Sequence, residues 1–175
     1  SKINKNLEFQ QIEVKNTLKS LNKIAHLWRK QYNIPVIAIT GSNGKTSTKE
    51  LLYHVLSSKY KIHATKGNFN TSLGLSLTLL ELDDSYDISI LELGASLPGE
   101  IKNLCKISNP THGLITNIAP AHLDGFGSIN KIIKEKSELF NSLKNGISFI
   151  NKTDKRIAKL KFEGKKITFG LSSDC

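Results

Sequence analysis

The segment TGSNGKTSTKE, residues 40–50, places two glycines, a lysine and several hydroxyl residues directly behind an apolar run. Backbone N–H groups freed by Gly41 and Gly44 can point at phosphate oxygens, and a following helix adds the dipole of its N-terminus. Lys45 would neutralise the outer phosphates, and Thr46 would place its hydroxyl on magnesium. The general phosphate-binding loop is longer between its glycines, so a plain strand-to-helix turn is the alternative. The strand before and the helix after favour phosphate binding.

A second candidate is Glu92, in the run ISILELG of residues 88–94. It interrupts an apolar strand near the carboxyl end of that strand. A buried carboxylate is costly unless it is paired or bound to a metal, and a magnesium ion on a nucleotide would supply the partner. The alternative is an edge position where Glu92 meets solvent.

His122 and Asp124 lie in the loop NIAPAHLDGFG, residues 117–127, behind another apolar strand. A single loop histidine is usually a surface residue. Its position matters because Lys45 and Glu92 also follow strands, and open α/β sheets bind ligands outside the carboxyl ends of their strands. We therefore expect the three segments to meet at one edge.

Lys136 is the most informative single residue. The segment SINKIIKEKSELFNSL, residues 128–143, has apolar residues on one helical face, and Lys136 falls in the middle of that face. Its neighbour Glu135 is expected on the solvated side. A lysine in such a place must snorkel to water, pair with an acid, or lose its charge and become a reactive amine. Periodicity alone does not decide between these outcomes.

The polar loop KGNFNTS, residues 66–72, also follows a strand. Its asparagines and threonine suit hydrogen bonding to a polar substrate. They equally suit an ordinary turn with a helix cap, and the pattern does not separate the two.

The elements that must position these residues alternate along the chain. We predict strands over residues 36–40, 61–64, 88–93, 113–118, 147–151 and 166–169, and helices over 45–58, 73–80, 98–106 and 128–143. Residues 1–32 read as a helical arm, which Pro35 ends. Continuous apolar strands separated by helices predict a doubly wound, mainly parallel α/β sheet.

Composition bounds the function. No run of the 175 residues is apolar for long enough to span a membrane, and the N-terminus lacks the apolar core of a signal peptide. Cys105 and Cys175 have no metal or redox spacing, so a reduced, cytoplasmic setting is expected. The net charge of +10 allows two interpretations: attraction for polyanions, or a lysine-rich surface without a specific partner.

Five collinear strings together resemble the central, ATP-binding domain of the Mur ligase family. They are WRKQYNIPVIAITGSNGKTSTKELL, TKGNFNTSLGLSLTLLEL, ISILELGASLPGEI, TNIAPAHLDGFGS and KEKSELF. The short GxxGKT loop is the family's own form. ELGA followed by GEI is typical of the member that adds D-alanyl-D-alanine to UDP-N-acetylmuramoyl-tripeptide.

The resemblance implies roles for individual residues. It assigns the ATP phosphates and magnesium to Gly41, Ser42, Asn43, Gly44, Lys45, Thr46 and Ser47, with Asn117 as a nearby polar contact. Thr46, Glu92 and His122 correspond to metal ligands. Lys136 corresponds to a lysine that reacts with carbon dioxide, giving a carbamate that helps to hold a second magnesium. Lys45, His122 and Lys136 are the expected catalytic residues, and Asn68, Asn70 and Thr71 resemble the substrate-side loop.

The implied reaction is an ATP-dependent, ADP-forming ligation of a carboxylate and an amine, by a monomer. Residues 1–32 would be the tail of a preceding domain and residues 33–175 the central domain, with a closing domain absent, so the isolated chain would be inactive. The rivals are another amino acid ligase of this family, including one of the folylpolyglutamate type, and a nucleotide- or nucleic-acid-binding module. The last explains neither Glu92 nor Lys136.

Overall fold

The structure is a computed structural model that describes residues 10–121 and 123–171. Its helices are α1 (Thr17–Arg29), α2 (Lys45–Leu56), α3 (Ser72–Leu80), α4 (Glu100–Ser108), α5 (Leu123–Phe126), α6 (Ile129–Asn141) and α7 (Lys155–Ala158). Its strands are β1 (Val36–Thr40), β2 (Ile62–Ala64), β3 (Ile88–Glu92), β4 (His112–Ile115), β5 (Ile147–Asn151) and β6 (Lys165–Phe169). From β1 onward at least one helix separates each strand from the next, with both α5 and α6 between β4 and β5, which confirms the predicted α/β class.

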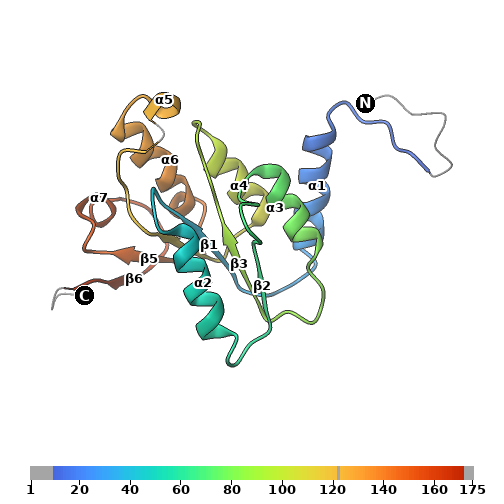
Figure 1. Cartoon of the computed structure of the whole chain (residues 1–175), viewed down its shortest axis with the longest axis horizontal. Coiled ribbons are helices and arrows are strands. Elements are labelled where there is room, and N and C mark those ends of the chain that lie inside the picture. The colour runs from blue at the N-terminus through green and yellow to red at the C-terminus, as the bar shows by residue number, and fades with distance from the viewer. Residues whose placement is uncertain (1–9, 122, 172–175) are drawn as a thin grey trace.

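The described strands form one sheet in the order β2-β3-β1-β4-β5-β6, and each neighbouring pair is parallel (Figure 1). The chain first builds the sheet to one side of β1 and then crosses over β1 to build the other side. In doubly wound sheets ligands bind at such a reversal, outside the carboxyl ends of the strands. The loop after β1 occupies this place.

Helices cover both faces of the sheet, unequally. Residues of α1, α3, α4 and α6 pack with alternate strand residues such as Val36 and Ala38 in the larger core. The other face is covered by α2 (Figure 1). There Leu52 and Leu56 of α2 pack against the smaller core, which contains Ile39 and Ile90. Side chains alternate along β1, so Val36 and Ala38 face the larger core while Ile37 and Ile39 face the smaller one. The N-terminus of α2 is placed directly behind β1.

The predicted N-terminal helix is too long. α1 begins at Thr17, and described residues 10–16 are not helical and extend away from the sheet (Figure 1). Asn16 is the cause, because its side chain accepts a hydrogen bond from the Lys19 N–H and caps the helix there. At the other end the Trp28 Nε1 donates to the Leu82 carbonyl at 3.0 Å, which anchors α1 beside α3.

The predicted strand over 113–118 is shorter and lies earlier. β4 ends at Ile115 because the next residues turn toward the loop after β1, where Thr116 and Asn117 form hydrogen bonds. The four-residue helices α5 and α7 were not predicted, since each is too short to carry a period.

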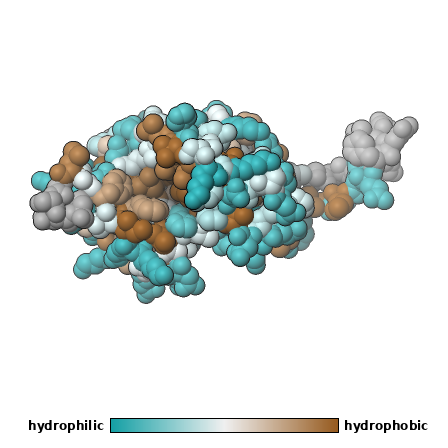
Figure 2. All heavy atoms as spheres, turned by 90° about the horizontal axis from the view of Figure 1, so that it is seen from below, coloured by the Kyte–Doolittle hydropathy of each residue, from teal (hydrophilic) through white to brown (hydrophobic). Residues whose placement is uncertain are grey.

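Within the described ranges, no helix is both long and apolar enough to cross a membrane. Figure 2 shows hydrophobic groups dispersed among hydrophilic ones on the face seen from below. Exposed apolar side chains occur on α1, α2 and α3, with Ile24, Leu51 and Leu73 all more than half exposed.

Candidate active site

The loop after β1, residues 41–44, passes directly into α2. Gly41 has φ +153° and Gly44 has φ +76°, conformations that L side chains rarely adopt. A Cβ on Gly41 would also collide with the hydroxyl of Thr116. Gly44 is the residue that precedes Lys45 at the start of α2, and no side chain caps this helix. Free N–H groups therefore remain at its N-terminus, as an anion site requires.

The segment after β4 holds this loop in place. The Thr116 hydroxyl donates to the Asn43 carbonyl at 2.6 Å, and the Asn43 N–H donates to Asn117 Oδ1 at 2.9 Å. The Ser42 N–H donates to the Asn117 carbonyl at 3.0 Å, while its hydroxyl bonds to the backbone of Ala119. Asn117 thus supports the backbone of the loop. Ser47, in the first turn of α2, is exposed.

Lys45 and Lys136 share one acceptor. Each Nζ donates to the carbonyl oxygen of Gly41 at 3.0 Å. Lys136 is 3% exposed, so its side chain does not reach water by snorkelling. Burial and, secondarily, the nearby charge of Lys45 lower the pKa of Lys136 to about 8, while Glu135 opposes this shift. The predicted position of Lys136 on the apolar face of its helix is confirmed, and the structure decides against snorkelling, which the sequence left open. A substantial fraction of this amine is neutral near pH 8.

Glu92 is buried and lies beside α2. Its side chain is 2% exposed, which contradicts the alternative of a solvated edge position. Oε2 accepts from the Thr46 hydroxyl at 2.8 Å and Oε1 accepts from Asn70 Nδ2 at 3.0 Å. Among the described residues Glu92 forms no ion pair. A buried carboxylate with only neutral donors fits a site for a cation.

The substrate-side loop reaches the same cleft through some of its residues. Asn70, Thr71 and Lys136 line a cleft of about 230 Å³ beside Gly41 and Lys45. Thr71 is the N-cap residue of α3, but its side chain makes no capping hydrogen bond. Asn68 is exposed, and its carbonyl accepts the Asn70 N–H at 2.7 Å, so its contact with the cleft is indirect.

Two charged residues of this region were missed or misplaced. Glu135 is 5% exposed, not solvated, because its carboxylate accepts the N–H groups of Gly99 and Ile101 at 2.7 Å each. Lys49, on α2, is 2% exposed, and its burial was not predicted. Its spacing from Leu52 and Leu56 gives the same signal that identified Lys136.

The remaining expected residues cannot all be placed. His122 lies outside the described residues. Asp124 follows in α5 and is exposed. The described site therefore brings together the loop after β1, Glu92, Asn70, Thr71 and Lys136 at the carboxyl edge of the sheet.

Comparison with known proteins shows the family to which this chain belongs. The family model for the Mur ligase middle domain matches residues 39–175. A UDP-N-acetylmuramoyl-tripeptide–D-alanyl-D-alanine ligase of Bacillus subtilis is 37% identical over 162 residues, which are 93% of this chain and 35% of that protein. The chain thus spans about a third of the length of such relatives.

Solved structures give the same relationship. The crystal structure of MurF from Acinetobacter baumannii superposes with a TM-score of 0.85 at 34% identity, covering 94% of this chain and 38% of that one. MurF ligase from Thermotoga maritima, solved in complex with ADP, superposes with a TM-score of 0.80 at 32% identity, covering 95% and 40%. The matched residues include the loop after β1, Glu92 and Lys136, and the chain belongs to the Mur ligase family as a middle domain.

Proposed function

We propose that this chain is the ATP-binding part of a ligase that joins D-alanyl-D-alanine to UDP-N-acetylmuramoyl-tripeptide. Two relatives support this reaction: the Bacillus subtilis ligase named for it, which is 37% identical to this chain, and the structurally similar MurF of Acinetobacter baumannii. The observation that carries the proposal is the convergence of Lys45, Lys136 and Glu92 at the carboxyl edge of the sheet. Positive groups and free N–H groups there face a buried carboxylate, as expected for a phosphate site with a divalent cation.

The loop after β1 would hold the phosphates of ATP. Its backbone N–H groups and the N-terminus of α2 supply donors, and Lys45 supplies a positive charge. The proposed nucleotide ligands are Gly41, Ser42, Asn43, Gly44, Lys45, Thr46 and Ser47, with Asn117 behind them. Asn117 acts through the backbone of the loop, given its bonds to Ser42 and Asn43.

The residues present fit a magnesium ion. Mg²⁺ prefers oxygen ligands, and the Thr46 hydroxyl lies beside the uncompensated carboxylate of Glu92. In the described part of the chain no group of three or more His, Cys, Asp and Glu side chains could hold a metal, so Glu92 would act with phosphate oxygens, water and His122. When bound, the ion would neutralise charge on the phosphates that Lys45 would also contact.

Lys136 would complete the site as a carbamate. A neutral amine attacks carbon dioxide through its nitrogen, forms an N–C bond and loses one proton, giving a carboxylate-like group. The lowered pKa of Lys136 supplies the neutral amine, and the resulting oxygens would suit a second magnesium ion. The change also replaces a buried cation near Lys45 with an anion, which removes their repulsion.

The proposed chemistry has two steps. A carboxylate oxygen of the tripeptide attacks the γ-phosphorus of ATP, and the bond to the β-phosphate oxygen breaks to release ADP. The amine of D-alanyl-D-alanine then attacks the acyl phosphate, loses a proton and displaces phosphate. Lys45 would neutralise charge in the first step, and Asn70 and Thr71, with Asn68 behind them, would orient the acyl substrate.

The domain assignment is part of the proposal. Residues 33–175 would form the ATP-binding domain, and residues 1–32 would connect it to a domain that holds the UDP-sugar. We expect the isolated chain to bind nucleotide without measurable turnover, since closure by a further domain commonly completes such sites.

The test is calorimetric titration of a non-hydrolysable ATP analogue, with magnesium, into the chain and into Lys45→Ala. Loss of a charge-assisted contact to phosphate predicts binding weaker by roughly 10- to 100-fold. Lys59→Ala is the matched control, because Lys59 lies exposed just beyond the other end of α2. Equal binding by the chain and Lys45→Ala would remove Lys45 from the nucleotide site.

A further inference from the structure

Lys49 is a charged residue on the buried face of α2. Its side chain is 2% exposed, and it lies about one turn beyond Lys45 and Thr46. A buried ammonium group is costly unless it is paired and hydrogen-bonded. Neither phosphate binding nor metal binding, as proposed above, gives Lys49 a role.

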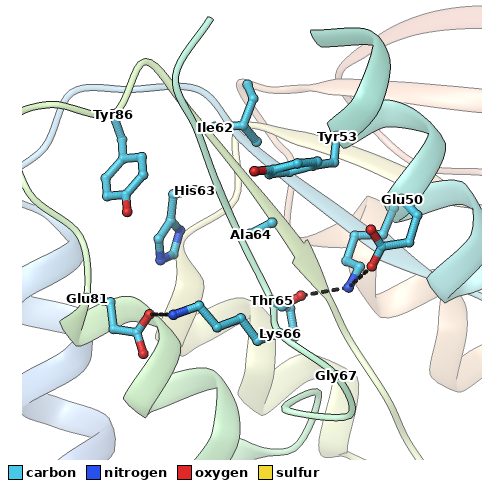
Figure 3. Close-up of a pocket in the computed structure, with 11 residues that line it drawn as sticks. Glu50, Tyr53, Ile62, His63, Ala64, Thr65, Lys66, Gly67, Glu81 and Tyr86 are labelled. Carbon is cyan, nitrogen blue, oxygen red and sulfur yellow. Dashed lines mark hydrogen bonds and ion pairs between the residues drawn. The ribbon is translucent and has the colours of Figure 1, made fainter. Parts of the chain in front are cut away.

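The contacts of Lys49 connect α2 to the end of β2. Its Nζ donates to the carbonyl of Thr65 at 2.7 Å and forms an ion pair with Glu50 at 2.8 Å (Figure 3). The Glu50 side chain is 63% exposed, so solvent weakens that pair. The bond to Thr65 is buried, and we therefore take it as the interaction that fixes Lys49.

Thr65 in turn contacts Glu92. The Thr65 hydroxyl accepts the Glu92 N–H at 3.0 Å, and the Thr65 N–H donates to the Ile90 carbonyl at 3.0 Å. Thr65 is 1% exposed, so these bonds are also shielded from water. One residue thus receives the Lys49 ammonium on its carbonyl and holds the backbone of Glu92 with its hydroxyl.

The same segment returns to Glu92 at its other end. Asn70 donates to Glu92 Oε1 at 3.0 Å, and its carbonyl accepts the Gly94 N–H at 2.9 Å. Thr46, on the helix of Lys49, donates to Glu92 Oε2. The contacts form a closed circuit from α2 through Lys49, Thr65 and Glu92 back to α2.

We propose that Lys49 is a positioning residue, which sets the place of Glu92 and of the loop 65–71 relative to the start of α2. This inference rests on the proposed function, because Glu92 is there a magnesium ligand and the loop orients the acyl substrate. Without Lys49, α2 and the loop could shift against each other. Nucleotide would still meet the loop after β1, but magnesium would add less to its affinity.

The first measurement needs no nucleotide. Amide hydrogen exchange at the Glu92 N–H, followed by NMR, should be roughly tenfold faster in Lys49→Met, as expected when one buried hydrogen bond loses its support. Glu50→Gln is the matched control, since it removes the exposed ion pair and leaves the bond to Thr65. Its exchange at Glu92 should equal that of the unchanged chain.

The second measurement compares the affinity for a non-hydrolysable ATP analogue with and without magnesium. Lys49→Met should retain the affinity measured without magnesium and lose most of the gain that magnesium gives. A merely structural defect would weaken both affinities together. Thr65→Val, which removes the hydroxyl that holds the Glu92 N–H, should behave in the same way and decides the matter if Lys49→Met fails to fold.

Faster exchange together with a reduced magnesium gain supports the inference. An unchanged exchange rate at the Glu92 N–H in Lys49→Met overturns it. A full gain in nucleotide affinity on adding magnesium to the folded variants also overturns it. So does a Glu50→Gln variant whose exchange at Glu92 is as fast as that of Lys49→Met. If the unchanged chain binds no nucleotide, the proposed function fails and this role of Lys49 fails with it. The exchange result then still states whether Lys49 holds Glu92, so the two failures are distinguishable.

Discussion

Lys136 combines burial with a second ammonium group at the same carbonyl oxygen, and this combination sets its chemistry. Carbamate formation requires the neutral amine, whose fraction rises as pH increases through the lowered pKa of about 8. An ordinary lysine, with a pKa near 10.4, would be almost fully protonated over the same range. Lys136 should therefore react with carbon dioxide selectively.

This reactivity can be observed by ¹³C NMR with ¹³C-labelled bicarbonate. The carbamate signal should grow between about pH 7 and pH 9, where the amine deprotonates, and it should be absent in Lys136→Met. Lys131→Met, in the same helix but exposed, should keep the signal. A signal that persists in Lys136→Met would assign the carbamate to another amine.

At the scale of elements, α6 supports α4 through Glu135. The two carboxylate oxygens of Glu135 accept the N–H groups of Gly99 and Ile101 at the start of α4. The N-cap residue of α4 is Gly99, which has no side chain to cap the helix, so Glu135 takes this role. Glu135 precedes Lys136, so this contact also fixes the rotation of α6 that turns Lys136 toward Gly41.

Glu135→Ala should lower the free energy of unfolding by about 2–3 kcal/mol, because two buried N–H groups lose a charged acceptor. Urea denaturation measures this change. Glu138→Ala, one turn later in the same helix, removes the same charge and should cost less, since no hydrogen bond of its carboxylate to α4 is found. Equal losses in the two variants would contradict the capping role.

The sequence predicts some of these elements better than others, for physical reasons. Apolar runs identify the strands, because the sheet is covered by helices on both faces. The spacing in α6 identifies Lys136, because the buried face of a helix carries apolar residues at a regular spacing. The place of Glu135 is not predictable in this way. Periodicity marks the face toward the sheet, whereas Glu135 lies toward the neighbouring helix and its partners come from a distant turn.

Lys49 shows a different limit. Its position on the apolar stripe with Leu52 and Leu56 was available from spacing, but its partner is a backbone carbonyl at Thr65. Backbone groups are common to all residues and leave no mark in a sequence. The α1 boundary is the opposite case, because Asn16 is a residue type that caps helices and the signal was present.

For the whole molecule, nucleotide binding should appear as thermal stability, because a ligand that binds only the folded chain shifts the unfolding equilibrium. At an analogue concentration of about 100 times its dissociation constant the gain is about 2.7 kcal/mol, which for a chain of this length raises Tm by roughly 5–10 °C. Differential scanning fluorimetry measures it. The rise in Tm should be smaller without magnesium, and smaller in Lys45→Ala at the same analogue concentration. A Tm that does not change when the analogue is added would contradict the proposal.

The close approach of Gly41 to Thr116 restricts how this sequence can change. Any side chain at position 41 meets the Thr116 hydroxyl, so a smaller residue at 116 would have to come first. Replacing Thr116 first removes the hydroxyl that donates to the Asn43 carbonyl, and this loosens the loop that contains Gly41. Each mutational order therefore passes through an impaired intermediate, and even a simultaneous replacement leaves position 41 at a φ of +153°, which L side chains rarely adopt.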